Sequence, residues 1–167
     1  MSFESMVAVL KERLGAEAIT TSQFRDNRRL VVPPEKLYDL LQFLKNGLGF
    51  DMLIDISAAD YLNYPNAKDR LGVFYALLNV TNGERIYVKS YLNEPDLTLP
   101  SAFSLWKAAD WLEREVFDMF GIVFEGHPDL RRILLPEEFK DFPLRKDYPL
   151  RGRGERHNFE RITREQS

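Results

Sequence analysis

The sequence predicts a two-layer α+β fold in which helices pack on a mixed, mainly antiparallel sheet and an extended C-terminal arm follows. Helical and strand-like apolar patterns are mixed without a β-α-β rhythm, and an Asn-Gly pair separates two β-rich runs. Apolar residues become sparse after residue 135. We therefore expect a core domain over residues 1–135 and an arm over residues 136–167.

The N-terminal region predicts a helix followed by two short strands. Apolar residues recur at helical spacing over residues 3–14, Ser2 can cap this helix, and Gly15 can end it. Residues 17–24 and 29–32 are rich in β-forming side chains, and polar residues between them predict a turn.

A second helix is expected to begin at Pro33-Pro34, because proline suits the first turn of a helix. Gly47 and Gly49 are its stop signals. Its apolar face is made of leucines, namely Leu37, Leu40, Leu41, Leu44 and Leu48.

The middle of the chain predicts strands. Residues 50–57 form a short β-like run, and residues 71–81 and 84–92 flank the pair Asn82-Gly83. An Asn-Gly pair between two β-rich runs is the strongest short-range signal for a hairpin.

A third helix is predicted from Ser101, which can cap it, to about Phe120, with Gly121 closing it. Its inner face is expected to contain Leu105, Ala109, Leu112, Val116 and Phe120. The large rings expected to anchor this helix in the core are those of Trp106, Trp111, Phe117 and Phe120.

The composition argues against several classes of function. The net charge of −3 is unlike that of a nucleic-acid-binding domain, and zero cysteines exclude thiolate-held clusters and disulfides. His127 and His157 stand thirty residues apart without partners at metal-ligand spacing. No glycine-rich nucleotide fingerprint is present, and every apolar run is far shorter than the roughly 20 residues that span a bilayer.

Glu113, Glu115 and Asp118 are the candidates for acid–base chemistry, with Arg114 between them. One hypothesis is a carboxylate pair with a raised pKa. The other is a polar helix face that pairs with arginines, and we favour it because no nucleophile or pocket-forming loop accompanies the cluster.

The arm over residues 136–167 contains three prolines and many arginines, so it cannot build a core of its own. It is either a solvated tail or a segment that docks on another surface, and its spaced large apolar residues favour docking. RNA binding is a weak alternative, because the basic and acidic residues of this region balance.

One stretch is more specific than all of these patterns. Residues 113–134 read Glu-Arg-Glu-Val-Phe-Asp-Met-Phe-Gly-Ile-Val-Phe-Glu-Gly-His-Pro-Asp-Leu-Arg-Arg-Ile-Leu. This segment, with residues 105–112, 135–138 and 143–149, resembles the 30-kDa-type, or C-type, subunit family of NADH:quinone oxidoreductase (respiratory complex I). The chain departs from that family at Asp141 and Phe142, where members usually have a glycine and often a histidine. The family-motif residues in this chain are Glu113, Arg114, Glu115, Asp118, Gly121, Gly126, His127 and Pro128.

The resemblance implies a non-catalytic, cofactor-free subunit of the water-exposed arm of the complex. Flavin and iron–sulfur clusters are then expected in partner subunits, and the neighbours are the D-type subunit and the iron–sulfur subunits of the B and I types. The complex would place the chain peripherally, on the cytoplasmic side of the cell (inner) membrane. Residues expected at subunit interfaces are Arg131, Arg132, Arg145, Lys146, Asp147, Tyr148, Arg151 and Arg153.

Two alternatives stay open at this point. The first is the equivalent subunit of a membrane-bound hydrogenase or of a ferredoxin:quinone reductase complex, in which the electron donor of the whole complex is not NADH. The other is an RNA- or protein-binding domain that shares only the fold, since fold alone does not fix function.

Overall fold

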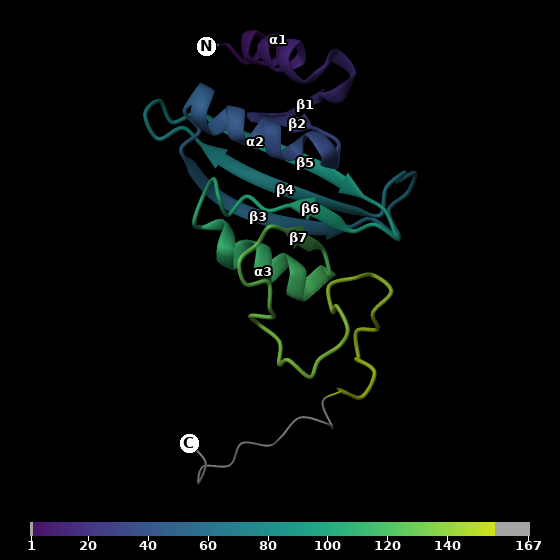
Figure 1. The fold of residues 1–167 in the computed structure, drawn as a ribbon. Coiled ribbons are helices and arrows are strands. Elements are labelled where there is room, and N and C mark those ends of the chain that lie inside the picture. Colours follow the sequence, from purple (N-terminus) through teal and green to yellow (C-terminus); the bar gives the residue numbers. More distant parts are fainter. Residues whose placement is uncertain (1, 156–167) are drawn as a thin grey trace.

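A five-stranded sheet runs through the centre of the molecule in the order β1-β2-β5-β4-β3 (Figure 1). Neighbouring strands are antiparallel, except for β2 and β5, which run parallel. The expected mixed, mainly antiparallel sheet is therefore confirmed. The computed structural model describes residues 2–155 of the chain. The strands of this sheet are β1 (Thr20–Phe24), β2 (Asn27–Val31), β3 (Met52–Asp60), β4 (Leu71–Leu78) and β5 (Arg85–Leu92).

Helices and a small second sheet make up the rest of the fold. The first two helices have the bounds that the sequence predicts. The Ser2 hydroxyl caps the N-terminus of the first helix by accepting a hydrogen bond from the Ser5 amide at 3.2 Å, and Gly49 closes the C-terminus of the second with a φ of 74°. The remaining elements are α1 (Phe3–Leu14), the 3-10 helix η1 (Ala16–Ala18), α2 (Pro34–Leu48), α3 (Ala109–Phe120) and the parallel pair β6 (Thr98–Pro100) and β7 (Val123–Glu125).

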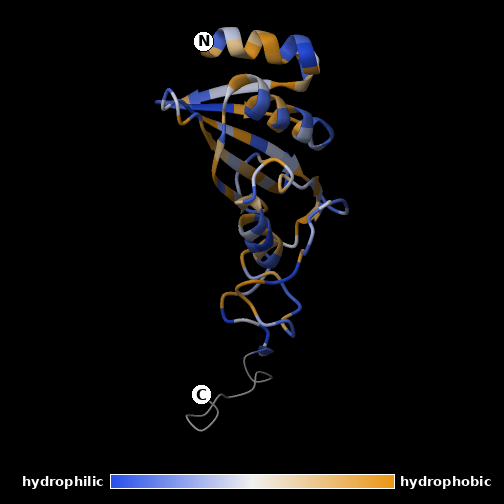
Figure 2. Ribbon diagram, turned by 60° about the vertical axis from the view of Figure 1, so that its left-hand side comes forward, coloured by the Kyte–Doolittle hydropathy of each residue, from blue (hydrophilic) through white to orange (hydrophobic). Residues whose placement is uncertain are grey.

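The core lies between the helices and one face of the central sheet. Along β4, Val73, Tyr75 and Leu77 are fully buried, whereas Phe74 and Ala76, on the opposite face, are half-buried. The period of two follows from the pleat of a strand, and Figure 2 shows the resulting bands of hydrophobic and hydrophilic residues along the ribbon. One sheet face is thus covered by helices, and the other lacks a covering layer within residues 2–155.

Four strand predictions differ from the observed bounds. The strand expected over residues 71–81 ends at Leu78. Residues 16–18 form the 3-10 helix η1 instead of the beginning of the first strand, which starts at Thr20. The second strand begins at Asn27, because the turn is tight and Arg25 takes a positive φ of 56°. The third strand covers Met52–Asp60, since pairing with β4 continues past the end of its apolar run.

The third helix begins at Ala109, so the prediction that Ser101 caps it is wrong. The Ser101 hydroxyl instead donates to the carboxylate of Glu113 at 2.6 Å and accepts from the Phe103 amide at 3.1 Å. The side chain that would have capped a helix is therefore committed to the second turn of α3. Residues 101–108 form turns, and the Trp106 indole donates to the Asp51 carbonyl at 3.1 Å.

The burial pattern of α3 also overturns the prediction that Trp111 anchors the core. The buried stripe of the helix follows Ala109, Glu113, Val116 and Phe120, a spacing that leaves Trp111 on the outer face with 65% of its surface exposed. Trp106 and Phe120 are buried as expected, and Phe117 is half-buried.

Candidate functional site

Asp118, near the C-terminal end of α3, organises the chain that follows the helix. One carboxylate oxygen accepts hydrogen bonds from the amides of residues 133, 134 and 135 at 3.0, 2.8 and 2.9 Å. The other oxygen pairs with the Arg132 guanidinium at 2.6 Å. Burial by itself would raise the pKa of Asp118, but these donors outweigh it and hold the pKa below its ordinary value. The expected pairing of this carboxylate with an arginine is confirmed.

Glu113 is buried just as completely but has a different environment. It accepts 2.6 Å hydrogen bonds from the Ser101 hydroxyl and the Ala102 amide, and no arginine within residues 2–155 pairs with it, so that part of the prediction is wrong. Burial raises the pKa of Glu113 to about 7, against the lowering effect of these two donors. Glu115 is exposed on the same helix. The hypothesis of a carboxylate pair with a raised pKa also fails for Glu115 and Asp118, because Glu115 is exposed and the pKa of Asp118 is lowered.

His127, in the turn that follows β7, joins this turn to the first turn of α3. Its Nδ1 accepts a hydrogen bond from the Asp129 amide at 3.1 Å, so Nε2 carries the proton in the neutral ring and donates to the Asp110 carbonyl at 3.2 Å. Gly126 takes a φ of 82°, a conformation that L side chains resist, and Pro128 completes the predicted turn.

Gly121 ends α3 and makes room for the arm. Its φ is 75°, and a Cβ atom built there would lie 2.5 Å from the ring of Phe142 and 2.8 Å from the Arg145 guanidinium. Arg145 donates to the Phe120 carbonyl at 2.6 Å and pairs with Glu94 at 3.1 Å. Both the backbone conformation and the available space therefore require glycine at this position.

The arm returns to the core between residues 142 and 148. Asp147 pairs with Arg70 at 2.6 Å, and the Lys146 amide donates to the buried Asp60 carboxylate at 2.8 Å. The hydrogen bond from Arg70 lowers the pKa of Asp147. Residues 136–155 contain no helix or strand of regular length, yet these contacts give them a defined path along the domain.

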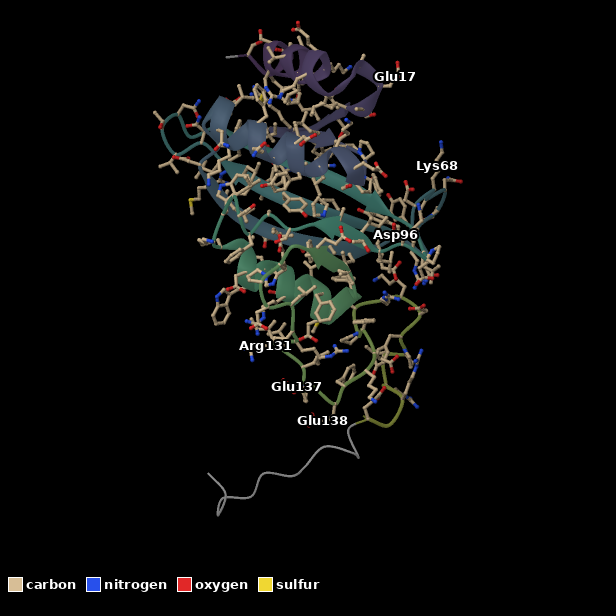
Figure 3. All side chains as sticks on the ribbon, viewed as in Figure 1. Glu17, Lys68, Asp96, Arg131, Glu137 and Glu138 are labelled. Carbon is tan, nitrogen blue, oxygen red and sulfur yellow. The ribbon has the colours of Figure 1, made fainter. Side chains whose placement is uncertain are left out.

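The predicted interface residues separate into two groups. Arg132, Arg145 and Tyr148 are partly covered by their own chain, and Asp147 is held by Arg70. The exposed group comprises Arg131, Lys146, Arg151 and Arg153; of these, Arg131 pairs with Asp129 and Arg153 pairs with Asp141 in exposed contacts. Figure 3 shows Arg131 and the two glutamates Glu137 and Glu138 at the end of the molecule away from α1.

Sequence reasoning missed several residues of this site. Ser101, Asp60, Arg70 and Glu94 bind the motif or the arm from distant positions, and no local pattern marks them. The large apolar residues that favoured docking include three exposed leucines, whose exposed fractions are 61% for Leu134, just before the arm, 51% for Leu144 and 104% for Leu150. His157 and the arginines 156, 161 and 164 lie outside the described residues.

Residues 2–155 contain no group of three or more His, Cys, Asp or Glu side chains arranged to hold a metal ion. Within the same range, no helix is both long and apolar enough to cross a membrane. The charged residues of the motif bind backbone groups, hydroxyls and one another.

Comparison with known proteins identifies the family. Residues 30–154 match the model of the family described as "Respiratory-chain NADH dehydrogenase, 30 Kd subunit". The C-type subunit of the NADH-quinone oxidoreductase of Citrifermentans bemidjiense is 41% identical over 87% of this chain and 89% of its own. The NADH-quinone oxidoreductase subunit 5 of Thermus thermophilus is 46% identical over 74% of this chain and 62% of its own.

Two solved structures share the fold. A structure titled as a trypsin-resistant fragment (1-134) of Nqo5 superposes with a TM-score of 0.67 at 37% identity, covering 74% of this chain and 98% of that chain. A chain of the membrane-bound sulfane sulfur reductase (MBS), an archaeal respiratory membrane complex, gives a TM-score of 0.73 at 26% identity, covering 96% of this chain and 94% of that chain. The family match over residues 30–154 and the relative at 41% identity show that the chain belongs to the 30-kDa, or C-type, subunit family of respiratory-chain NADH dehydrogenase.

Proposed function

We propose that this chain is the cofactor-free, C-type subunit of the hydrophilic arm of an NADH:quinone oxidoreductase, where it supports the quinone-reducing module. In this role it holds neighbouring subunits together, and electron transfer from NADH to quinone, coupled to proton translocation, is a property of the whole complex. Flavin and iron–sulfur clusters belong to partner subunits. The chain has no activity of its own and reaches the cytoplasmic side of the cell membrane peripherally, through the complex.

The observation that supports this role is how the motif uses its charges. Asp118 fixes residues 133–135, Glu113 fixes residues 101–102, and Arg114 donates to the carbonyls of residues 131 and 132 at 3.2 Å. These side chains set the path of the backbone instead of facing a substrate. The motif is therefore a rigid joint between the core domain and the arm.

The arm that this joint positions presents a surface suited to other chains. Leu144 and Leu150 are exposed, as is Leu134 just before the arm, and Lys146 and Arg151 lie close to Leu144 and Leu150 in the sequence with their side chains in solvent. Exposed apolar side chains with nearby cations are typical of protein–protein contacts. We assign this surface to a neighbour of the D type and to the iron–sulfur subunits of the B and I types.

A co-purification experiment tests the proposal. The full chain is tagged and expressed with the other subunits, and Leu134, Leu144 and Leu150 are replaced by serine together. We expect recovery of the D-type and B-type subunits to fall by about tenfold, as when interface anchors are removed. The melting temperature of the isolated chain should stay unchanged, because these side chains are exposed.

The matched control replaces three exposed apolar residues outside the arm, Val9, Phe24 and Val80, by serine. Recovery of the partners from this control should equal that from the wild type. Unchanged recovery from the arm variant would contradict the proposal. NADH oxidation by the isolated chain, or a flavin or iron–sulfur absorbance in it, would also contradict it.

A second candidate function is the equivalent subunit of a related membrane-bound hydrogenase or ferredoxin:quinone reductase complex. The likeness to a chain of the archaeal sulfane sulfur reductase complex, which covers 96% of this chain, favours keeping this candidate. A complex purified through the tagged chain distinguishes the two. Electron transfer from NADH supports the first function, whereas transfer from reduced ferredoxin or hydrogen, without NADH oxidation, supports the second.

A further inference from the structure

The sheet face turned away from the helices contains a cavity built around Lys89. Phe74 on β4 pairs with Lys89 on β5, and both side chains point away from the core. The next pair, Tyr75 and Val88, points into the core. The cavity has a volume of about 430 Å³. Its main lining residues are Arg29, Ser57, Tyr61, Phe74, Tyr87 and Lys89.

Lys89 is enclosed by aromatic rings, although it lies on the uncovered face. Only 9% of its surface is exposed, and Nζ lies 4.5, 4.4 and 4.2 Å from the ring centroids of Tyr61, Phe74 and Tyr91. Nζ also donates to the Tyr61 hydroxyl at 2.8 Å. The negative faces of the rings stabilise the ammonium group and hold it in one position.

Gly72 is part of this construction. A Cβ atom at this position would lie 2.9 Å from Cε of Lys89 and 3.1 Å from the ring of Tyr61. The glycine on β4 therefore leaves the space through which the lysine side chain passes. Its backbone needs no special conformation, so its small size serves the packing of Lys89.

The rings of Tyr61, Phe74 and Tyr91, which form a cage around Lys89, leave some of the N–H donors of its ammonium group without a partner in the described part of the chain. An ammonium group has three N–H donors, and one of them goes to Tyr61. Because Tyr61 accepts that bond, its own O–H proton is free to donate. In the range 2–155 no carboxylate lies within ion-pair distance of Lys89, and Arg29 adds a second cation to the same lining. The complementary group is an anionic acceptor.

We propose that this cavity receives a carboxylate side chain from an acidic, extended segment of a neighbouring subunit. A second hollow, of about 300 Å³, shares Tyr61 with the first and continues along the loop that carries Tyr64 and Lys68. Figure 3 shows Lys68 on that loop. Two adjoining hollows lined by aromatic rings suit a stretch of polypeptide with more than one anchored side chain. This inference rests on the proposed function, because it needs a partner subunit, but it concerns a surface separate from the arm.

Substitution of the cations tests the inference in the assembled complex. Lys89→Met keeps the aliphatic stem and removes the charge, and Arg29→Met removes the second cation without touching the cage. For each variant we expect about tenfold weaker retention of the partner at moderate salt, because a desolvated charge pair is lost. The control is Lys107→Met, an exposed lysine stacked on Phe103 at 3.7 Å, which should retain the partner like the wild type.

A photo-crosslinking amino acid placed at Tyr87 identifies the occupant in the assembled complex. The expected product joins this chain to a Glu- or Asp-rich segment of another subunit. Crosslinks to a second copy of this chain, to a non-acidic segment, or to nothing would overturn the inference.

The failure of this inference is separable from that of the proposed function. If the cation variants retain partners normally while the arm leucine variant loses them, the proposed function stands and the cavity proposal falls. If the arm variant retains partners while the cation variants lose them, the arm assignment falls instead. If Lys89→Met lowers the melting temperature of the isolated chain, Arg29→Met alone decides the outcome.

Discussion

The two ends of α3 each bury a carboxylate, yet the two carboxylates behave in opposite ways. At the N-terminal end Glu113 receives two hydrogen bonds, and burial raises its pKa to about 7. At the C-terminal end Asp118 receives three amide hydrogen bonds and an arginine, and its pKa falls below the ordinary value. Burial raises the pKa of both groups, and at Glu113 the nearby Asp110 raises it further, whereas at Asp118 the donors outweigh burial.

The difference separates two kinds of joint. Around Asp118 the negative charge is part of the construction, because it satisfies donors that would otherwise be buried without partners. Around Glu113 the negative charge destabilises the fold, because it is buried without a cation from residues 2–155. The protonated side chain can still bind residues 101 and 102. We expect the stability of the C-terminal end of α3 to depend on the charge of Asp118. The stability of the N-terminal end should depend on the shape and hydrogen bonds of Glu113 and not on its charge.

The largest effect is expected at Asp118. Asp118→Asn places an amide among donors and leaves Arg132 without its counter-ion, so the free energy of unfolding should fall by about 3–5 kcal/mol, as for a broken buried ion pair. Chemical denaturation of the isolated chain measures this loss. The exposed Glu115→Gln on the same helix is the control and should change it by less than about 0.5 kcal/mol. A loss of similar size in both variants would remove the distinction.

The second effect is the pH dependence at Glu113. Its pKa is raised in the folded state from 4.5, so the stabilisation by its protonated form is complete below about pH 4.5 and is lost as the pH rises to about 7. Relative to Glu113→Gln, the free energy of unfolding of the wild type should decrease by about 3 kcal/mol over that range. Denaturation curves at several pH values measure it, and a pH-independent difference would show that Glu113 titrates normally.

The third effect compares the two motif glycines at positive φ. Gly121→Ala should lower the free energy of unfolding by about 2–3 kcal/mol, because backbone strain adds to a clash with Phe142. Gly126→Ala carries a similar strain but meets no atom within 4 Å, so about 1 kcal/mol is expected. Thermal unfolding of both variants checks which one loses more stability. Equal losses would show that the contact with Phe142 at Gly121 does not affect stability.

The smallest effect concerns Trp111, on the outer face of α3. Trp111→Ala should change the free energy of unfolding by no more than about 0.5 kcal/mol, since the ring is exposed. Its counterpart is the buried Trp106, whose removal should cost about 3–5 kcal/mol. Tryptophan fluorescence during denaturation reports on both. A large loss from Trp111→Ala would mean that this ring contributes to the joint after all.

These contrasts show what the sequence could and could not predict. The caps at Ser2, Gly15 and Gly49 and the hairpin at residues 82–83 were recognised, because their signals are local. The start of α3 was misplaced because the Ser101 side chain binds Glu113 twelve positions later, and no window of sequence shows that contact. The exposure of Trp111 was missed for a different reason: its large ring suggested burial, although it lies off the stripe formed by Ala109, Val116 and Phe120.

The candidate site was predictable in its motif but not in its connections. Residues 113–134 indicated the family directly, and the pairing of Asp118 with an arginine was expected. The partners Arg70 and Glu94 come from loops next to β4 and β5 with no motif of their own, so only the folded chain brings them to the arm. The interface assignment of the exposed basic residues stays a prediction.

The parallel pairing of β2 with β5 has a consequence for synthesis on the ribosome. β2 emerges early with β1 beside it, but the strand that fills its other edge follows only after α2, β3 and β4 have been made. Until then an unpaired strand edge is open to the wrong neighbour, and closing so long a loop is slow. A translation pause or a chaperone acting before residue 92 would therefore affect the yield of native protein more than one acting on the arm.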